Sequence, residues 1–121
     1  MEKSYVKFET PEDVSQKALD LVESSYRTGK VKKGTNEVIK SIERGESKLV
    51  VIAEDVNPPE VVYYLPSLCE DKKVPYVYVK KKADLGSKVG IASAASVSIV
   101  DYGKNEELYK SIVSALEQIK K

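Results

Sequence analysis

The stretch KLVVIA, residues 48–53, decides the fold of this chain. It is a continuous apolar run of strand length, which is typical of a strand buried on both faces of a sheet. Two further runs of strand character follow, YVYV at 76–79 and SVSIV at 96–100. Helical patterns lie between the three runs. Strands that alternate with helices through short links predict right-handed crossovers and a sheet sandwiched between helices.

Cap and stop residues mark the helices around these strands. We predict a helix from Thr10, with Pro11 in its first turn, to Gly29, one from Thr35 to Gly45, one after the sequence NPPE at 57–60 with a kink at Pro66, a short one ending at Gly90, and one over 106–120. Thr35 is expected to be an N-cap, because its hydroxyl can accept a hydrogen bond from an amide at the helix start. The chain has no repeat, linker or low-complexity segment, so we expect one domain over residues 1–121.

The predicted helix at 35–45 has two opposed faces, since successive residues are separated by about 100°. The apolar face must be buried and consists of Val38, Ile39 and Ile42. The polar face consists of Asn36, Glu37, Lys40 and Arg44. Cations, carboxylates and amides are the groups that hydrogen-bond the edges of nucleobases, and a helix start favours a phosphate. The same residues also suit an ordinary surface helix, so the pattern alone leaves both interpretations open.

The distribution of charge favours a nucleic-acid partner. The net charge is only +1, which is low for a nucleic-acid-binding domain. Residues 26–44 and 72–88, however, each hold six basic residues, whereas residues 54–71 hold five acidic residues and no basic one. A polyanion can therefore bind one basic face while the rest of the protein stays neutral or acidic.

Missing residue types exclude several classes of function. The chain has no histidine and a single cysteine, Cys69, which excludes histidine-based catalysis, imidazole metal sites, disulfides and zinc knuckles. Cys69 lies among apolar residues and is interpreted as a buried thiol. We expect no enzymatic activity, no cofactor and no metal. The charged start, MEKSYVKFETPED, and the lack of a membrane-length apolar run predict a cytoplasmic protein.

Polar residues at the strand ends offer a second hypothesis. Glu54 and Asp55 follow the first predicted strand, three lysines at 80–82 follow the second, and Asp101 follows the third. Such residues would share one edge of a parallel sheet and could handle a phosphoryl group with Mg²⁺, as in a receiver domain. Lysines stand where the phosphoacceptor aspartate is needed, however, and no glycine-rich phosphate loop is present. A solvated lysine loop and a purely protein-binding module are further alternatives.

Several segments match a known family when they are taken together. The chain contains, in order, KKGTNE (32–37), ERG (43–45), KLVVIAEDVNPPEVV (48–62) and LPSLCEDKKVPYVYVKKKADLG (65–86). In this combination it resembles the L7Ae family of kink-turn RNA-binding proteins, which includes spliceosomal and H/ACA small-nucleolar relatives. The resemblance covers nearly the whole chain. It implies an α/β fold, a three-layer α-β-α sandwich with a small mixed sheet of about four strands.

The resemblance also implies a function. A kink-turn is a bent RNA duplex with tandem sheared G·A pairs beside a short bulge. Archaeal members of the family serve the large ribosomal subunit, box C/D and H/ACA guide ribonucleoproteins, and ribonuclease P, where they nucleate assembly. The expected partners are therefore these RNAs and other ribonucleoprotein core proteins, with a monomer when free and no membrane.

Matching motifs assign RNA-binding roles to individual positions. The residues implied to line the sheared pairs are Gly34, Thr35, Asn36, Glu37 and Lys40. The residues implied to hold phosphates are Lys33 and Arg44. The pocket for an extruded bulge nucleotide is implied to consist of Val61 and Lys82, with Asn57 at its mouth. The loop implied to cover the bulge contains Gly90, Ile91, Ala92 and Ser93.

The chain departs from the family pattern at a few positions. Asn57 stands where relatives often have an acid, and Lys88 replaces a small residue. The segment GIASAAS at 90–96 is about one residue shorter than in relatives and lacks their Glu or Arg. We therefore expect this loop to contribute shape and apolar contact with little hydrogen bonding.

Overall fold

The computed structural model describes residues 5–57 and 60–119. For Glu60 and Val61 it describes the backbone alone. The elements, in chain order, are α1 (Glu12–Thr28), β1 (Lys30–Lys33), α2 (Thr35–Glu43), β2 (Leu49–Ala53), α3 (Glu60–Tyr63), α4 (Leu65–Lys72), β3 (Tyr76–Val79), α5 (Lys82–Ser87), β4 (Ser96–Asp101) and α6 (Glu106–Ile119). In the described part of the chain, every helix is too short or too polar to cross a lipid bilayer.

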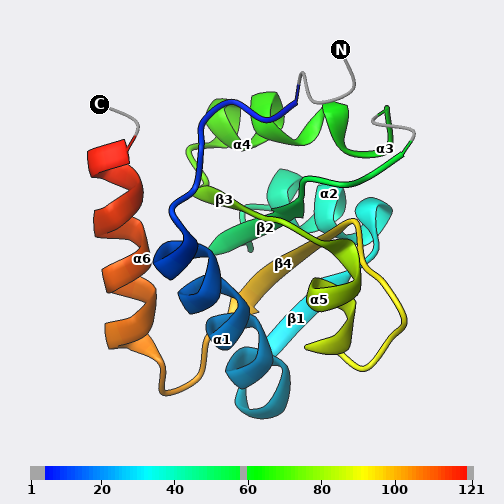
Figure 1. The fold of residues 1–121 in the computed structure, drawn as a ribbon. Coiled ribbons are helices and arrows are strands. Elements are labelled where there is room, and N and C mark those ends of the chain that lie inside the picture. Colours follow the sequence, from blue (N-terminus) through cyan, green and yellow to red (C-terminus); the bar gives the residue numbers. More distant parts are fainter. Residues whose placement is uncertain (1–4, 58–59, 120–121) are drawn as a thin grey trace.

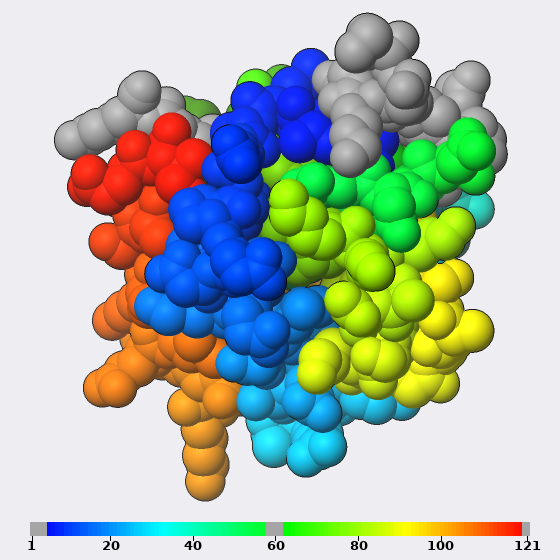
Figure 2. All heavy atoms as spheres, viewed as in Figure 1, coloured from blue at the N-terminus to red at the C-terminus, as the bar shows by residue number. Residues whose placement is uncertain are grey.

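The four strands form one mixed sheet in the order β1-β4-β2-β3. β2 and β3 are parallel, and β4 is antiparallel to both β1 and β2. On one face, α1 packs against the sheet with α6 and α5 on its two sides, while on the other face α2 lies against β1 and β4 and contacts α4 (Figure 1). Figure 2 shows the layer formed by α1, α5 and α6 from outside. The expected three-layer α-β-α sandwich with a four-stranded mixed sheet is confirmed.

The core lies on both faces of the parallel pair of strands, β2 and β3. Every residue of β2 and of β3 is buried, as the continuous apolar runs predict. The hydroxyl of Tyr78 donates a hydrogen bond to the Tyr5 carbonyl oxygen at 2.6 Å, and the hydroxyl of Tyr5 donates to the Ala53 carbonyl oxygen at 2.8 Å. Burial raises the pKa of both phenols, so both stay neutral donors. Cys69 is buried, as expected.

Strand β1 is not predicted by the pattern of apolar residues. Its sequence, KVKK, has one apolar residue, and the sequence analysis finds only the three longer strands. The segment becomes a strand because it pairs with β4, with Val31 opposite Ile99 and Lys33 opposite Val97. Lysines are common on edge strands, where they discourage pairing with a further chain.

The parallel arrangement that the predicted crossovers require is found for β2 and β3 but not for β4. After α5 the chain turns back, and the Ala94 amide donates a hydrogen bond to the Lys82 carbonyl oxygen at 3.0 Å. β4 therefore begins at the edge where β3 ends and runs antiparallel to β2. As a result, Asp101 lies at the opposite edge of the sheet from Glu54 and Asp55, contrary to the expectation that the three acids share one edge.

Helix α1 begins later than predicted. Pro11 is its N-cap and Glu12 its first residue. Thr10 is not part of the helix, because its hydroxyl accepts a hydrogen bond from the Tyr78 amide on β3 at 3.3 Å. The helix ends as predicted, with Gly29 as its C-cap.

Two other helix predictions also need correction. The third predicted helix is divided into α3 and α4 at Tyr64, so that Pro66 lies in the first turn of α4, where its missing N–H is tolerated. Helix α5 ends at Ser87 instead of Gly90, because the amides of Val89 and Ile91 both donate to the Gly86 carbonyl oxygen and form a turn there. The last predicted helix matches α6, with residues 120–121 outside the described residues.

Candidate nucleic-acid interface

The sheet topology brings four segments together at one edge. β1, β2 and β3 end at this edge and β4 begins there, because β4 runs against its two neighbours and β2 and β3 are parallel. The start of α2, the loop after β2, the start of α5 and the loop before β4 therefore meet on the right of Figure 1. We call this region the α2 edge; it comprises residues 33–37, 54–57, 80–82 and 90–95.

Gly34 and Thr35 form the start of α2. Gly34 is the N-cap, with φ 92° and ψ 135°, a conformation that glycine adopts readily. A Cβ on Gly34 would meet no described atom within 4 Å, so the backbone conformation alone requires glycine. The prediction that Thr35 is the N-cap is wrong: its Oγ1 lies 3.5 Å from Ser96 Oγ on β4. Among the described residues, no side chain caps the first amides of α2.

The two predicted faces of α2 are confirmed. Val38 and Ile42 are buried and Ile39 is half-buried. The exposed polar residues are Asn36, Glu37, Lys40 and Arg44. Glu37 and Lys40 lie 3.7 Å apart, and since each side chain is about half exposed, their ion pair is weak and leaves both groups available to a ligand.

A chain of hydroxyl groups attaches α2 to β4. Ser41 Oγ lies 2.7 Å from the Val38 carbonyl oxygen and 2.8 Å from Ser98 Oγ. Ser98 Oγ in turn lies 2.7 Å from Ser47 Oγ. Ser41 and Ser98 are buried, so these hydrogen bonds are directional contacts in a region of low dielectric. Together with the buried valine and isoleucine they hold the polar face of α2 in one orientation.

Lys33 joins the end of β1 to the segment after α5. Its ammonium donates a hydrogen bond to the Val89 carbonyl oxygen at 3.0 Å and lies 5.1 Å from the centroid of the Tyr26 ring. The RNA-binding positions predicted from the sequence include Lys33 but not Tyr26. Nothing in the local pattern marks Tyr26, because it comes from α1 and reaches this site only through the packing of α1 against β1.

The loop after β2 is attached to the start of α5. Asp55 Oδ1 accepts a hydrogen bond from the Lys82 amide at 2.8 Å, and Glu54 Oε1 lies 4.0 Å from Lys80 Nζ. Both acids therefore neighbour lysine residues. Among the described residues, His, Cys, Asp and Glu form no group of three that could hold a metal ion. The receiver-like hypothesis thus lacks the acidic cluster that it needs.

The loop at 90–95 packs closely on α5. A Cβ on Gly86 would lie 2.5 Å from Ser93 Cα, so glycine is required for this approach. Ile91, Ala92 and Ser93 are exposed. The side chains that this loop offers to a ligand are small or apolar, which agrees with the expected contribution of shape.

The predicted nucleotide pocket is described only in part. Asn57 is exposed and Lys82 half-exposed, and both lie at the α2 edge. Val61 lies in α3, but its side chain is outside the described residues, as are residues 58–59. The contact between Val61 and Lys82 therefore stays a prediction.

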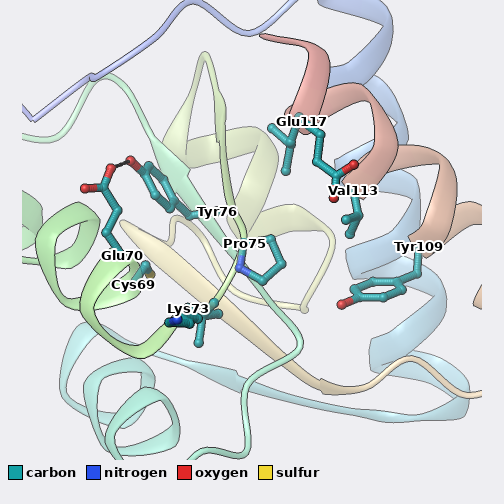
Figure 3. Close-up of a pocket in the computed structure, with 10 residues that line it drawn as sticks. Cys69, Glu70, Lys73, Pro75, Tyr76, Tyr109, Val113 and Glu117 are labelled. Atoms are coloured by element: carbon teal, nitrogen blue, oxygen red, sulfur yellow. Dashed lines mark hydrogen bonds between the residues drawn. The ribbon is translucent and has the colours of Figure 1, made fainter. Parts of the chain in front are cut away.

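A cavity of about 510 Å³ lies at the opposite edge of the sheet, between α4 and α6 (Figure 3). Apolar groups line much of it, among them Pro75 before β3 and Val113 and Leu116 of α6. Glu70 accepts a hydrogen bond from the Tyr76 hydroxyl at its wall, and burial is the main cause of the raised pKa of that phenol. We call this region the α6 edge; its residues differ from all predicted RNA-binding positions.

Comparisons with known proteins agree with this architecture. The model of the ribosomal protein L7Ae/L30e/S12e/Gadd45 family matches residues 16–109. The chain is 95% identical over 121 residues to the large ribosomal subunit protein eL8 of Thermoplasma volcanium, covering 100% of both chains. It is 77% identical over 117 residues to the protein of the same name from Picrophilus torridus, covering 97% of this chain and 92% of that one.

A solved structure has the same fold. The 15.5kD RNA binding protein of Giardia lamblia superposes with a TM-score of 0.87 and 34% sequence identity. The superposition covers 94% of this chain and 95% of the Giardia protein.

Proposed function

The chain belongs to the ribosomal protein L7Ae/L30e/S12e/Gadd45 family, and on this premise we propose that it binds kink-turn RNA as a component of the large ribosomal subunit. Membership of this family of ribosomal proteins identifies a structural protein and not an enzyme, as the residue composition led us to expect. The RNA-binding role is supported by the name of the Giardia structure and by the chemistry of the α2 edge.

The observation that carries the proposal is the fixed polar face of α2. Asn36 and Glu37 lie in the first turn, where the buried Val38 beside them holds the backbone in place. Their amide and carboxylate can bond the base edges that sheared G·A pairs expose, and Lys40 follows one turn later. Because Gly34 carries no side chain, a base can approach the backbone at the helix start. Thr35 lies against Ser96, so its contribution is to shape this surface.

Phosphates are held on either side of these base contacts. Lys33 precedes the helix and Arg44 is its C-cap, so the two cations lie at opposite ends of α2. Both side chains are exposed and can neutralise phosphates on the two strands of a bent duplex.

The bulge nucleotide enters beside the start of α5. Lys82 is held there by the bond between its amide and Asp55, with Asn57 in the same loop. We propose that Val61 completes an apolar wall of the pocket and that Ile91, Ala92 and Ser93 cover the extruded base. Single-stranded bulge bases are the usual targets of such pockets, because they are already unstacked.

The cellular roles follow from the same recognition. We propose one RNA-binding domain over residues 1–121, monomeric when free, which acts in the ribosome and also in box C/D and H/ACA guide particles and ribonuclease P. In each, binding of the kink-turn would create a composite surface on which other core proteins assemble. The acidic segment 54–71 is our candidate for such protein contacts, and the cytoplasm is the expected compartment.

A gel shift tests the proposal. The protein is titrated into a kink-turn RNA and into the same RNA with its G·A pairs replaced by Watson–Crick pairs. We expect tight binding of the first and only weak, salt-sensitive binding of the second. Equal affinities would reject kink-turn recognition, and binding of neither RNA would favour a purely protein-binding module.

A further inference from the structure

We propose that Tyr26 is a positioning residue of the RNA interface: its ring and the Val89 carbonyl together hold the ammonium of Lys33 where it meets an RNA phosphate. This inference rests on the proposed function and adds a residue of α1 to it. Tyr26 is not among the RNA-binding positions predicted from the sequence, and none of those positions lies in α1.

The geometry around Lys33 leaves its charge available. A lysine ammonium has three N–H groups. One is directed at the Val89 carbonyl oxygen, 3.0 Å away, and the ring of Tyr26 lies 5.1 Å away at its centroid. Neither partner carries a negative charge, so the positive charge is held in place without being neutralised. The remaining N–H groups can donate to a phosphate.

The restraint matters because lysine is flexible. A free lysine side chain loses much rotamer freedom when a phosphate fixes it, and this loss opposes binding. A cation over an aromatic face is attracted to the negative face of the ring, so the Tyr26 ring lowers the number of conformers before RNA arrives. The same contact restrains the residue that leads into α2, since Lys33 directly precedes Gly34, the N-cap of that helix.

Tyr26 also lies beside Gly90, the first residue of the loop at 90–95. Its hydroxyl oxygen lies 3.2 Å from the point that a Cβ on Gly90 would occupy, and Gly90 has φ 76°. Glu23, one turn earlier on α1, lies 3.8 Å from Lys88 Nζ. Figure 2 shows the C-terminal half of α1 lying against α5 and the segment that follows it. Tyr26 thus bridges the phosphate-binding lysine and the bulge-covering loop, although its side chain remains 45% exposed.

The test is a double-mutant cycle on kink-turn RNA affinity, with melting temperatures measured in parallel. Tyr26→Leu removes the aromatic face, Tyr26→Phe keeps it, and Lys33→Gln removes the cation. We expect Tyr26→Leu to weaken binding about two- to fivefold, as the loss of an exposed cation–π contact implies, and Tyr26→Phe to bind like wild type. In a Lys33→Gln background, Tyr26→Leu should have no further effect, because the residue it positions is gone.

Two matched controls identify a nonspecific effect. Lys30→Gln removes an exposed lysine at the other end of β1, where Lys30 lies opposite Asp101 of β4 in the strand register. The effect of Tyr26→Leu should persist in that background. Tyr64→Leu removes another exposed tyrosine, and its effect should be the same with and without Lys33. A merely structural role of Tyr26 predicts equal losses in all backgrounds, and this additivity would overturn the inference.

A measurement on the wild-type protein alone covers the case in which Tyr26→Leu does not fold. The ε-protons of Lys33 should be shifted upfield in the NMR spectrum by the ring current of Tyr26, and they should move again on adding RNA. Unshifted ε-protons in the free protein would overturn the inference while the proposed function stands. A wild-type protein without preference for the kink-turn would overturn the proposed function, and this inference with it.

Discussion

The α2 edge and the α6 edge lie at opposite ends of the same sheet and differ in what they offer a ligand. At the α6 edge a cavity of about 510 Å³ opens between α4 and α6, lined by apolar side chains and flanked by Glu70, Glu117 and Lys73. At the α2 edge and along the polar face of α2 that continues from it, the surface is built from a helix start, exposed amide and carboxylate groups, and cations at 33, 40, 44 and 82. The first arrangement suits a small apolar group and the second suits a large polyanion.

The difference shows that the cavity of a small protein and the polar groups that recognise its ligand can lie in separate places. A folded RNA brings its own shape, so the protein needs a rigid surface with polar groups in fixed places. Glycines at 34, 86 and 90 support that surface in different ways, by a backbone conformation with positive φ at 34 and 90 and by a close approach of the loop to α5 at 86. If the comparison is right, substitutions at the two edges should have effects of different kinds.

The largest effect is expected at the base-contacting groups. Asn36→Ala and Glu37→Ala should each weaken kink-turn RNA binding by about 1–3 kcal/mol and remove the preference over Watson–Crick duplex. Melting temperature should barely change, because both side chains are exposed. The matched control is Glu117→Ala with Gln118→Ala, an exposed carboxylate and amide on α6. Titrations in which the double variant Asn36→Ala with Glu37→Ala weakens RNA binding no more than the double variant on α6 would show that the two edges do not differ in RNA recognition.

The next largest effect is expected at Gly86, where the loop at 90–95 packs closely on the backbone of α5. Gly86→Ala places a Cβ about 2.5 Å from Ser93 Cα, and the shift this requires should lower the free energy of unfolding by about 1–3 kcal/mol. RNA affinity should fall too, since the loop at 90–95 must move. Gly103→Ala is the control, with a Cβ 2.8 Å from Thr28 Oγ1 at the other edge. Urea unfolding should show both variants destabilised, and only Gly86→Ala should bind RNA more weakly once folded.

Phosphate contacts should produce a smaller and less selective effect. Lys33→Gln or Arg44→Gln should weaken all RNAs alike and lower the slope of log affinity against log salt by about one. Lys110→Gln, an exposed lysine of α6, should leave the slope unchanged. Slopes that do not change for Lys33 and Arg44 would show that neither residue contacts phosphate.

The smallest effect on RNA is expected at the cavity. Val113→Ala enlarges the cavity at the α6 edge and should cost on the order of 1 kcal/mol of folding free energy. RNA affinity should equal that of wild type. A clear loss of affinity in this variant would mean that the two edges are coupled, and the sharp division between them would have to be abandoned.

The sequence predicts well those elements that a local pattern of apolar residues identifies, whichever element packs beside them. β2 and β3 are buried on both faces, so their apolar runs identify them regardless of which strand lies beside them. The stripe on α2 is equally local, since it depends only on helical periodicity. For the same reason, the exposed candidates Asn36, Glu37, Lys40 and Arg44 could be found before the structure.

The elements that the sequence does not predict depend on distant contacts. β1 exists through its pairing with β4, far along the chain, and its lysines conceal it. The direction of β4 follows from the hydrogen bond between Ala94 and Lys82, which no periodicity encodes. Thr35 looks like an N-cap locally, but Ser96 lies within reach of its hydroxyl. The role of Tyr26 could not be predicted for the same reason, because its contact with Lys33 joins two different elements, α1 and β1.

We propose that the rigid α2 edge selects RNA that is already bent. Fluorophores on the two arms of a kink-turn RNA report this directly, in buffer without Mg²⁺. Energy transfer between the arms should rise with protein and saturate together with binding, and Lys82→Ala should need a higher protein concentration to reach the same final value. Binding that saturates while energy transfer stays at the value of the free RNA would show that the α2 edge does not select bent RNA.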